Sequence, residues 1–420
     1  MRNLTRMTNV VKRLLRHSIG LTASWQILLC IAFLSFPGAS TAERHGNGRS
    51  NQPGNQEFRT VGRGIEHLRL TRGHKSENDS TGPWLINLLR LDLKQVDLRV
   101  TLALDEGLGL ETTTSMARRY GAIAAVNAGF FRTTGTYRGE SSGVLVVEGK
   151  LISEPLEGHA AFGLIRRATG AAIIFGHLKF SGYLVTGRGR RIAVGGLNRP
   201  RGADELIVYT PEFHRTTLTT PDGVEAFVRK NTVARVGDGE GSGVIPPDGL
   251  VVSASGRARE WILSKLRAGS RVRLEAKLEP VESEMNEAWR RASFIVGGGP
   301  QLIKEGKVAI TFEAEKIAQR FVSDRHPRTA IGRLKDGRVL FATVDGRQPG
   351  VSVGMSLTEL ADLLLEFGAS EAINLDGGGS TTMVVHGKLV NVPSDQTGER
   401  PVSDAILVLP SGLQQKSRVH

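Results

Sequence analysis

The segment Asn374-Leu-Asp-Gly-Gly-Gly-Ser-Thr-Thr-Met383 contains the residue types in this chain that are best suited to chemistry. Three successive glycines follow a short apolar run, so their main-chain N–H groups could converge on a phosphate or carboxylate oxygen. Asp376 adds a carboxylate and Ser380 adds a hydroxyl donor. The lysine that a Walker loop requires is missing. The segment fits a glycine-rich hairpin turn equally well, so other residues must decide between a turn and a site.

Two further strings place charged residues at the ends of expected strands. In Arg325-His-Pro-Arg-Thr329, Pro327 restricts the backbone before Arg328, whose guanidinium could hold two phosphate oxygens at once. His326 could carry a proton, although a single histidine beside a proline is more often a partly buried loop residue. In Asp345-Gly-Arg347 a carboxylate and a guanidinium flank a glycine. This pair is either a salt bridge across a turn or a carboxylate beside an anion clamp.

The candidate residues are concentrated in one part of the sequence. Those at the edges of successive expected strands are Arg328, Asp345, Arg347, Asn374, Asp376 and Ser380. This density favours a site over a series of unrelated turns. A second glycine string, Val296-Gly-Gly-Gly-Pro300, also follows an apolar run, and two such strings would let the backbone approach a sugar from two sides. Arg400 is a weaker candidate, because surface arginines are usually solvated.

Two similar helix–turn–strand units are expected to position these loops. The first has a helix from about Thr114 to Tyr120 and a buried strand that ends in Asn127-Ala-Gly-Phe-Phe131. The second has a helix over residues 357–367, with a capping box at its start, and a strand that ends at Asn374. Each asparagine comes six residues after the glycine that ends the helix. The units are either carriers of a site at strand ends or ordinary core units with tight turns.

Composition favours a protein rich in β-strands. Glycine accounts for 51 of the 420 residues, aromatic residues for only 5%, and the expected helices are few and short. We therefore predict an α+β fold with mixed, largely antiparallel sheets. One catalytic domain is expected over residues 82–410, with a β-rich insertion between 175 and 290. Residues 43–81 are interpreted as a polar tether that leads into a first strand, and residues 411–420 as a tail.

The N-terminus has the features of a secretory signal. Met1 to Ala42 contains five cations and no acid, then an apolar run from Trp25 to Phe36 and small residues at the cleavage positions. The run is shorter than the roughly 20 residues that a membrane helix needs. We therefore expect a secreted or periplasmic protein with no stable membrane span after signal removal; an uncleaved anchor is the alternative.

Cysteine, charge and histidine usage exclude several kinds of site. Cys30 is the only cysteine and lies in the apolar run, so disulfides, thiolate catalysis and cysteine-bound zinc are not expected. Without the signal the net charge falls from +13 to +8, since 50 cations remain against 42 acids. This mild excess suits an anionic substrate, and the lack of basic runs mixed with aromatics argues against nucleic acid. No HExxH pattern is present, and we expect no cofactor, although Asp345 and Asp376 could jointly hold Ca²⁺ or Mg²⁺.

With these strings identified, the chain resembles the phosphodiester glycosidase family, whose bacterial members include secreted proteins linked to exopolysaccharide. Six segments carry the resemblance, in family order, over roughly residues 84 to 409. They are Asn127-Ala-Gly-Phe-Phe131, Gly139-Glu-Ser-Ser-Gly143, Gly297-Gly-Gly-Pro300, Arg325-His-Pro-Arg-Thr329, Val344-Asp-Gly-Arg347 and Asn374-Leu-Asp-Gly-Gly-Gly-Ser380. The resemblance implies cleavage of a sugar-1-phosphodiester at its anomeric carbon.

The resemblance also implies roles for the candidate residues. The phosphate leaving group has a second pKa near 6, so cationic stabilisation of its charge matters more than protonation. Asp376 and Asp345 compete as nucleophile, general base or stabiliser of the oxocarbenium ion, with Glu140 as the third candidate. The predicted phosphate ligands are Arg328, Arg347 and the amides of Gly377, Gly378 and Gly379. The residues predicted to orient the sugar are Asn127, Asn374 and Ser380, and the remaining predicted contacts are Gly129, Gly298, Gly299, Thr329 and Arg400.

Two functions therefore stay open at this point. In the first the protein hydrolyses glycosyl phosphodiesters of envelope or extracellular polymers. In the second it binds a phosphate-containing glycan without catalysis, as an assembly factor for exopolysaccharide. Replacement of the aspartates by asparagine should abolish turnover in the first case and mostly spare binding in the second.

Overall fold

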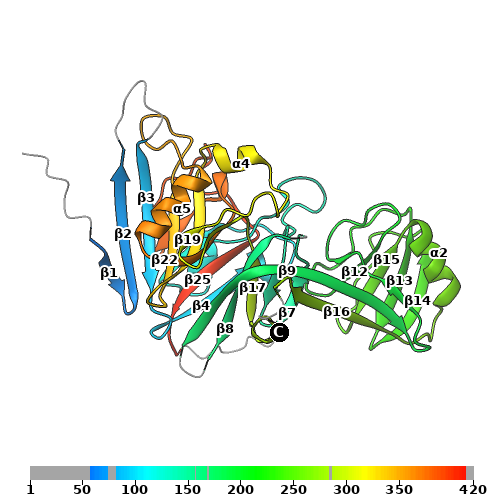
Figure 1. Ribbon diagram of the computed structural model, residues 1–420. Coiled ribbons are helices and arrows are strands. Elements are labelled where there is room, and N and C mark those ends of the chain that lie inside the picture. The colour runs from blue at the N-terminus through cyan, green and yellow to red at the C-terminus, as the bar shows by residue number, and fades with distance from the viewer. Residues whose placement is uncertain (1–56, 74–81, 157, 168–169, 283–285, 413–420) are drawn as a thin grey trace, which may run out of the picture. The chain divides into compact units, whose positions relative to one another are not determined.

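The computed structural model describes residues 57–73, 82–156, 158–167, 170–282 and 286–412, all within one compact unit, Pro53–His420. The signal predicted over residues 1–42 lies outside the described residues, as do residues 413–420 of the predicted tail. Strands dominate and the helices are few and short (Figure 1). Nearly all strand pairs are antiparallel, and the predicted α+β fold is confirmed. No helix among the described residues is long and apolar enough to cross a membrane.

An eight-stranded antiparallel sheet forms the first layer of the body. Its strands, in spatial order, are β1 (Arg59–Gly62), β2 (Ile65–Arg72), β3 (Trp84–Leu91), β21 (Val339–Val344), β20 (Arg328–Leu334), β22 (Ala369–Asn374), β18 (Gln301–Lys304) and β19 (Lys307–Val308). β2 pairs along its whole length with β3, which buries Ile65, Leu68 and Leu70. The folded domain therefore begins before residue 82, inside the segment that was predicted to be a tether.

Two further sheets pack against this layer. The seven-stranded sheet contains β10 (Arg191–Ala193), β9 (Ala171–Thr186), β8 (Ala160–Arg166), β17 (Phe294–Gly297), β6 (Leu145–Val147), β7 (Lys150–Ser153) and, beside β9, β16 (Val272–Pro280). The five-stranded sheet contains β24 (Lys388–Leu389), β23 (Met383–Val385), β5 (Ala124–Asn127), β25 (Asp404–Pro410) and β4 (Val96–Leu102). One apolar cluster joins Phe341 of the first sheet, Phe162 of the second and Val408 of the third.

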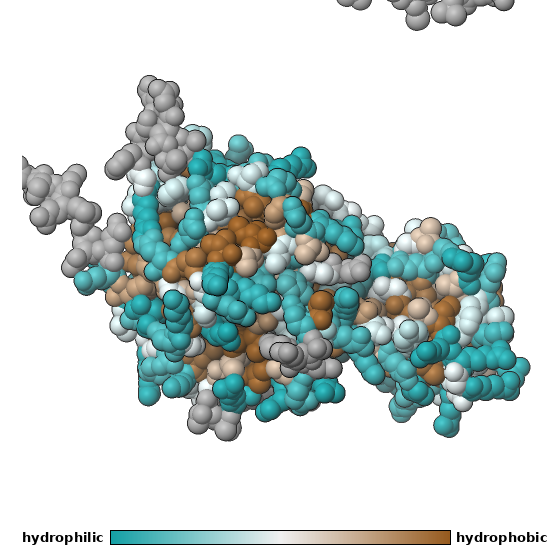
Figure 2. Space-filling model, viewed as in Figure 1, coloured by the Kyte–Doolittle hydropathy of each residue, from teal (hydrophilic) through white to brown (hydrophobic). Residues whose placement is uncertain are grey.

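Helices cover the opposite face of the eight-stranded sheet. α5 (Leu357–Glu366) and α4 (Gln319–Ser323) pack there in a second apolar cluster. The predicted capping box of α5 is present, because the Ser356 hydroxyl and the Glu359 carboxylate each accept the other residue's main-chain N–H. In Figure 2 hydrophobic residues gather over the region of α5, while most of the visible surface is hydrophilic.

Residues 196–265 form a module of their own within the expected insertion. Its five strands are β11 (Gly196–Leu197), β12 (Leu206–Tyr209), β15 (Gly249–Ala254), β13 (Val224–Arg229) and β14 (Thr232–Asp238), and α2 (Gly256–Lys265) packs on them. The long strand β9 carries the chain to this module: its first half pairs with β8 and its second half with β10 and β16 (Figure 1). We refer to residues 196–265 as the module.

The two expected helix–turn–strand units are both present. α1 (Thr113–Arg119) leads through Gly121 into β5, and α5 leads through Gly368 into β22. Both glycines have positive φ angles, 64° and 87°, which favour glycine just after a helix. The units lie in different sheets, so their similarity in sequence does not make them neighbouring strands. Their loops nevertheless meet at the candidate site.

Candidate active site

The ends of β5 and β22 are joined by hydrogen bonds around Asn127. The Asn127 amide nitrogen donates to the main-chain oxygen of Asp376 at 2.6 Å, and the Asp376 N–H donates to the Ala128 oxygen at 3.1 Å. The Asn127 side-chain oxygen accepts from the Thr329 hydroxyl at 2.9 Å and from the Thr382 N–H at 3.0 Å. Asn127 is buried, so it fixes the loop that carries Asp376, and Thr329 is part of the same network.

Asn374 joins this loop to the second glycine string. Its amide nitrogen donates to the Gly299 oxygen at 2.8 Å, and the Gly299 N–H donates to the main-chain oxygen of Asn374 at 2.8 Å. A Cβ atom on Gly298 would collide with the same main-chain oxygen. Gly298 therefore allows close packing against β22, while a Cβ atom on Gly299 would lie 2.8 Å from the Glu315 carboxylate. The predicted contact of both glycines with a sugar stays a prediction.

Asp376 is the predicted acid that combines exposure with a strongly shifted pKa. Its side chain is partly exposed, although protein surrounds it on most sides. Burial raises its pKa to about 7, and the charge of Asp404 acts in the same direction. Ser380, Arg400 and the Gly377 N–H oppose this shift. A carboxyl group with this pKa can gain or lose a proton near neutral pH.

Asp404 is the site residue that the sequence did not predict. It is buried at the start of β25, and its carboxylate accepts from the Gly129 N–H at 2.7 Å and from the hydroxyls of Ser403 and Ser141. Burial raises its pKa. A Cβ atom on Gly129 would lie 3.3 Å from this carboxylate, so glycine leaves room for Asp404. The one sequence signal was an acid directly before the last apolar run of the chain.

Two arginines flank the glycine turn that follows Asp376. The guanidinium of Arg347 lies against Gly378, since a Cβ atom there would be 3.1 Å from one of its nitrogens. The guanidinium of Arg400 occupies the space beside Gly379 and forms two hydrogen bonds with Asp395, at 2.7 and 2.9 Å. Arg347 forms no ion pair within the described residues and is exposed, so its charge is available to an anion.

Two of the three amides predicted to form an anion nest, those of Gly377 and Gly378, are engaged within the protein. The Gly378 N–H donates to the Pro327 oxygen at 2.9 Å, and the Gly377 N–H interacts with the Asp376 carboxylate. The turn is a short 3-10 helix over Gly378–Ser380. Gly378 and Gly379 leave space for the two arginines, and Gly377 leaves space for the main chain of Pro327.

Arg328 faces away from this site, contrary to the prediction. Its guanidinium is buried and donates to the main-chain oxygens of Met355, Phe321 and Asp324, each at 2.8 Å. Burial and the nearby charge of Arg347 lower its pKa to about 10. Strand alternation explains the difference, because Thr329 occupies the face of β20 that meets Asn127 and Arg328 occupies the other face.

His326 lies at the edge of the site. It is half-buried, and its Nδ1 atom is 3.5 Å from a guanidinium nitrogen of Arg347. Burial and the charges of Arg328 and Arg347 lower its pKa, so the imidazole is neutral at neutral pH. A neutral imidazole could accept a hydrogen bond from Arg347 and hold its guanidinium.

Asp345 and Glu140 are held by other parts of the protein. Asp345 is buried and accepts from the Val392 N–H at 2.9 Å and from the Asn391 amide at 3.1 Å, and burial raises its pKa to about 6. Glu140 is buried against Arg132 at 3.0 Å, and burial raises its pKa as well. Both carboxylates therefore have contacts typical of structural anchors.

A divalent cation finds little support in this arrangement. Both oxygens of Asp345 already accept hydrogen bonds, which reduces their capacity to ligate Ca²⁺ or Mg²⁺ together with Asp376. The part of the chain that the structure describes contains no group of three or more side chains placed to hold a metal ion.

A cavity of about 350 Å³ adjoins the glycine turn through Arg400 and Asp395. Its other lining residues are Leu110, Phe131, Thr133, Arg138, Thr397 and Pro401. The cavity combines one aromatic ring, threonine hydroxyls and two arginines, a mixture of apolar and polar groups that suits a sugar ring. Arg400 thus contacts both the turn after Asp376 and this cavity.

Comparison with known proteins identifies a similar family. Residues 222–409 match the family model described as phosphodiester glycosidase. The resemblance to that family is confirmed. The matched range contains Arg347, Asp376, Arg400 and Asp404, whereas the strings around Asn127 and Glu140 lie outside it.

Curated relatives of the phosphodiester glycosidase family match a part of the chain. N-acetylglucosamine-1-phosphodiester alpha-N-acetylglucosaminidase of Mus musculus is 31% identical over 166 residues, which cover 38% of this chain and 32% of that protein. The enzyme of the same name from Bos taurus is 31% identical over 166 residues. The chain therefore spans about a third of the length of these relatives.

Two solved structures share the fold over most of the chain. A protein from Synechocystis superposes with a TM-score of 0.70 at 24% identity, covering 83% of this chain and 62% of that one. A protein from Burkholderia pseudomallei K96243, described as a candidate exported protein, superposes with a TM-score of 0.70 at 28% identity, covering 79% of this chain and 74% of that one.

Proposed function

We propose that this protein hydrolyses a sugar-1-phosphodiester at the anomeric carbon and releases the sugar and a phosphate monoester. The observation that carries the proposal is the placement of Asp376. It is partly exposed, has a pKa of about 7, precedes a glycine turn that Arg347 and Arg400 flank, and is within reach of the charges of Arg400 and the buried Asp404. The family match and the names of the curated relatives support this reaction class.

The charges of the site suit the reaction. The bond between the anomeric carbon and the phosphate oxygen breaks, its electron pair leaves with the phosphate, and water supplies the new C–O bond. Arg347 and Arg400 would stabilise the departing phosphate, whose second pKa near 6 makes it a good leaving group. Asp376 would act on the anomeric carbon or on the attacking water, and its carboxylate would stabilise the positive charge of the sugar ring.

Asp404 would control the protonation of Asp376. Two carboxyl groups that interact through their charges do not both ionise readily, and the charge of Asp404 raises the pKa of Asp376. Asp376 is partly exposed, whereas Asp404 is buried and accepts a hydrogen bond from the Gly129 N–H. Asp376 is therefore the acid that meets the substrate, and Asp404 is a positioning residue.

We further propose that the substrates are glycosyl phosphodiesters of envelope or extracellular polymers. A location outside the cytoplasm is supported by the signal expected over residues 1–42, and the Burkholderia protein is described as a candidate exported protein. The mild positive charge of the remaining chain favours anionic substrates.

An assay for free reducing sugar tests the activity. Incubation with UDP-N-acetylglucosamine and a panel of other sugar-1-phosphodiesters should release sugar, and Asp376→Asn should lower kcat by about a thousandfold or more. The matched control is Asp336→Asn, which removes an exposed acid from the β20–β21 turn and should leave kcat unchanged. Absence of release across the panel, together with phosphate-dependent glycan binding, would instead identify a non-catalytic binding protein.

A further inference from the structure

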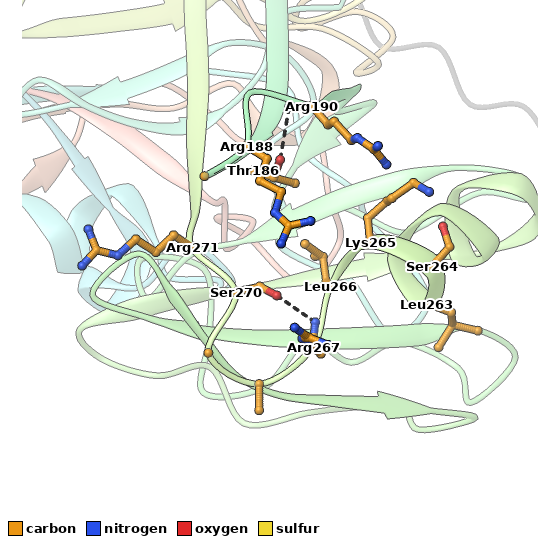
Figure 3. Close-up of a pocket in the computed structure, with 13 residues that line it drawn as sticks. Thr186, Arg188, Arg190, Leu263, Ser264, Lys265, Leu266, Arg267, Ser270 and Arg271 are labelled. Carbon is orange, nitrogen blue, oxygen red and sulfur yellow. Dashed lines mark hydrogen bonds between the residues drawn. The ribbon is translucent and has the colours of Figure 1, made fainter.

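A second cavity lies at the edge of the module, between the end of α2 and residues 186–190 and 266–271, away from the segments that form the candidate active site. It has a volume of about 670 Å³ and lies between the β9–β10 turn, the end of α2 and the segment that leads to β16 (Figure 3). Its lining includes five cations and no acid. These cations are Arg188, Arg190, Lys265, Arg267 and Arg271. A volume of this size is typical of ligand pockets.

The positive charge of this cavity is not neutralised by the protein. None of its five cations forms an ion pair within the described residues. Arginines of the module itself are paired instead: Arg229 with Asp248, Arg257 with Asp204 and Arg259 with Asp238. Gathered like charges repel one another, and here no carboxylate offsets that cost. An anionic ligand would offset it.

The side chains are arranged to contact a ligand from two walls. In Figure 3 those of Arg188, Arg190 and Lys265 extend into the space between the β9–β10 turn and the end of α2, whereas Arg271 points away. On each wall a main-chain N–H donates to a side-chain hydroxyl and holds the local backbone. The Arg190 N–H donates to the Thr186 hydroxyl at 3.2 Å, and the Arg267 N–H donates to the Ser270 hydroxyl at 3.0 Å. The backbone is therefore fixed while the guanidinium groups stay free.

We propose that this cavity binds the acidic groups of a phosphate-bearing glycan chain, as a second site separate from Asp376. No aromatic residue lines the cavity, which disfavours single-stranded nucleic acid because that ligand needs stacking surfaces. Leu263 is its only exposed large apolar side chain, which disfavours insertion into a membrane. The choice of a glycan over other polyanions rests on the proposed function.

A second site of this kind would matter for polymers and not for small substrates. A chain with regularly spaced phosphates could occupy the module cavity while another of its units reaches Asp376, which raises the effective concentration at the active site. The site should therefore lower KM for a polymer and leave turnover of a small sugar phosphodiester unchanged.

Binding of poly(glycerol phosphate), measured by calorimetry at two salt concentrations, tests the proposal. The variant Arg188→Gln/Arg190→Gln should weaken binding by about tenfold or more and reduce its salt dependence, because fewer counterions are displaced. The control Arg273→Gln/Lys277→Gln removes the same charge from exposed positions on β16 and should change Kd by less than about twofold. A third variant, Arg267→Gln, changes the opposite wall and should also weaken binding.

Several outcomes would overturn the inference. One is an equal loss of affinity in the test and control variants, which would show a diffuse charge effect. Another is that an oligodeoxythymidylate, or phosphatidylglycerol vesicles, bind more tightly than poly(glycerol phosphate) does. The inference fails if the test variant also weakens that tighter binding. Because binding is measured without turnover, its failure leaves the proposed hydrolysis standing, and failure of hydrolysis leaves the binding result intact.

Discussion

The charge state of the candidate site depends on two carboxyl groups, Asp376 and Asp404. Hydrogen bonds from Gly129 and two serines support the Asp404 carboxylate, while Asp376 has Arg400 and Ser380 near it. Burial raises the pKa of both groups, and the charge of Asp404 adds to the shift at Asp376. Their environments differ mainly in exposure, which is why the proposed function has Asp376 contact the substrate.

Replacement of Asp404 should change the pH dependence of activity. The charge of Asp404 raises the pKa of Asp376, so Asp404→Asn should lower that pKa and shift the acidic limb of the kcat profile to lower pH by on the order of one unit. The asparagine oxygen can still accept the Gly129 N–H, which preserves the fold. An unchanged pH profile, with only a lower melting temperature, would assign Asp404 a purely structural role.

Replacement of Asp376 should change the pH dependence of stability. Burial raises its folded-state pKa from 3.8 to about 7, so between these values the folded state holds a proton that the unfolded state has lost. The favourable contribution of the Asp376 carboxyl to the free energy of unfolding is present below about pH 4 and is lost as the pH rises to about 7. Relative to the wild type, Asp376→Asn should therefore gain stability over this range, by about 1–2 kcal/mol after allowance for solvent screening.

Denaturant unfolding at several pH values measures this effect. The control Asp336→Asn should differ from the wild type by a constant amount between pH 4 and pH 8, because Arg338 lowers the pKa of Asp336 and its stabilisation is lost only below about pH 4. A constant difference between Asp376→Asn and the wild type from pH 4 to pH 8 would contradict the raised pKa.

At the scale of the element, the glycine turn serves two purposes. A Cβ atom on Gly377 would lie 2.6 Å from the main-chain oxygen of Pro327, whereas a Cβ atom on Gly379 would meet the side-chain ends of Arg400 and Asp395. Gly377→Ala should therefore cost about 1–3 kcal/mol of stability, because backbone has to move. Gly379→Ala should keep near-native stability and lower kcat/KM by about tenfold or more, because Arg400 is displaced.

Thermal unfolding and steady-state kinetics on the two glycine variants separate these effects. Equal losses of stability in both would mean that the turn has one purely structural role. Unchanged kinetics in a folded Gly379→Ala protein would remove Arg400 from the set of phosphate ligands.

Local patterns in the sequence were sufficient to predict elements but not the faces that they present. The capping box of α5 and the two glycine-ended helices were predicted because their signals are local, and both units were found. Arg328 was assigned to the site because nothing in the sequence shows which face of β20 meets Asn127. Asp404 was missed because only the pairing of β25 with β5, where Ala405 lies opposite Asn127, brings it to Gly129.

At the scale of the whole molecule, one aromatic residue links the body to the module. Tyr137 lies in the loop between β5 and β6, and its ring stacks on Phe213 with the centroids 5.8 Å apart. Its hydroxyl donates to the Thr217 oxygen at 2.7 Å. The next residue, Arg138, lines the cavity beside Arg400. The module thus contacts the loop that forms one wall of this cavity.

Removal of the Tyr137 ring should destabilise both the module and the loop around Arg138. Tyr137→Ala should cost about 3 kcal/mol or more, because it empties a packed aromatic site, whereas Tyr137→Phe should cost only about 1 kcal/mol for the lost hydrogen bond. Hydrogen exchange should increase in residues 206–217 and in the loop around Arg138, and KM should rise more than kcat falls. If exchange increases in the module alone and KM stays constant, the module is not coupled to the cavity, and its basic pocket would then act as an independent binding site.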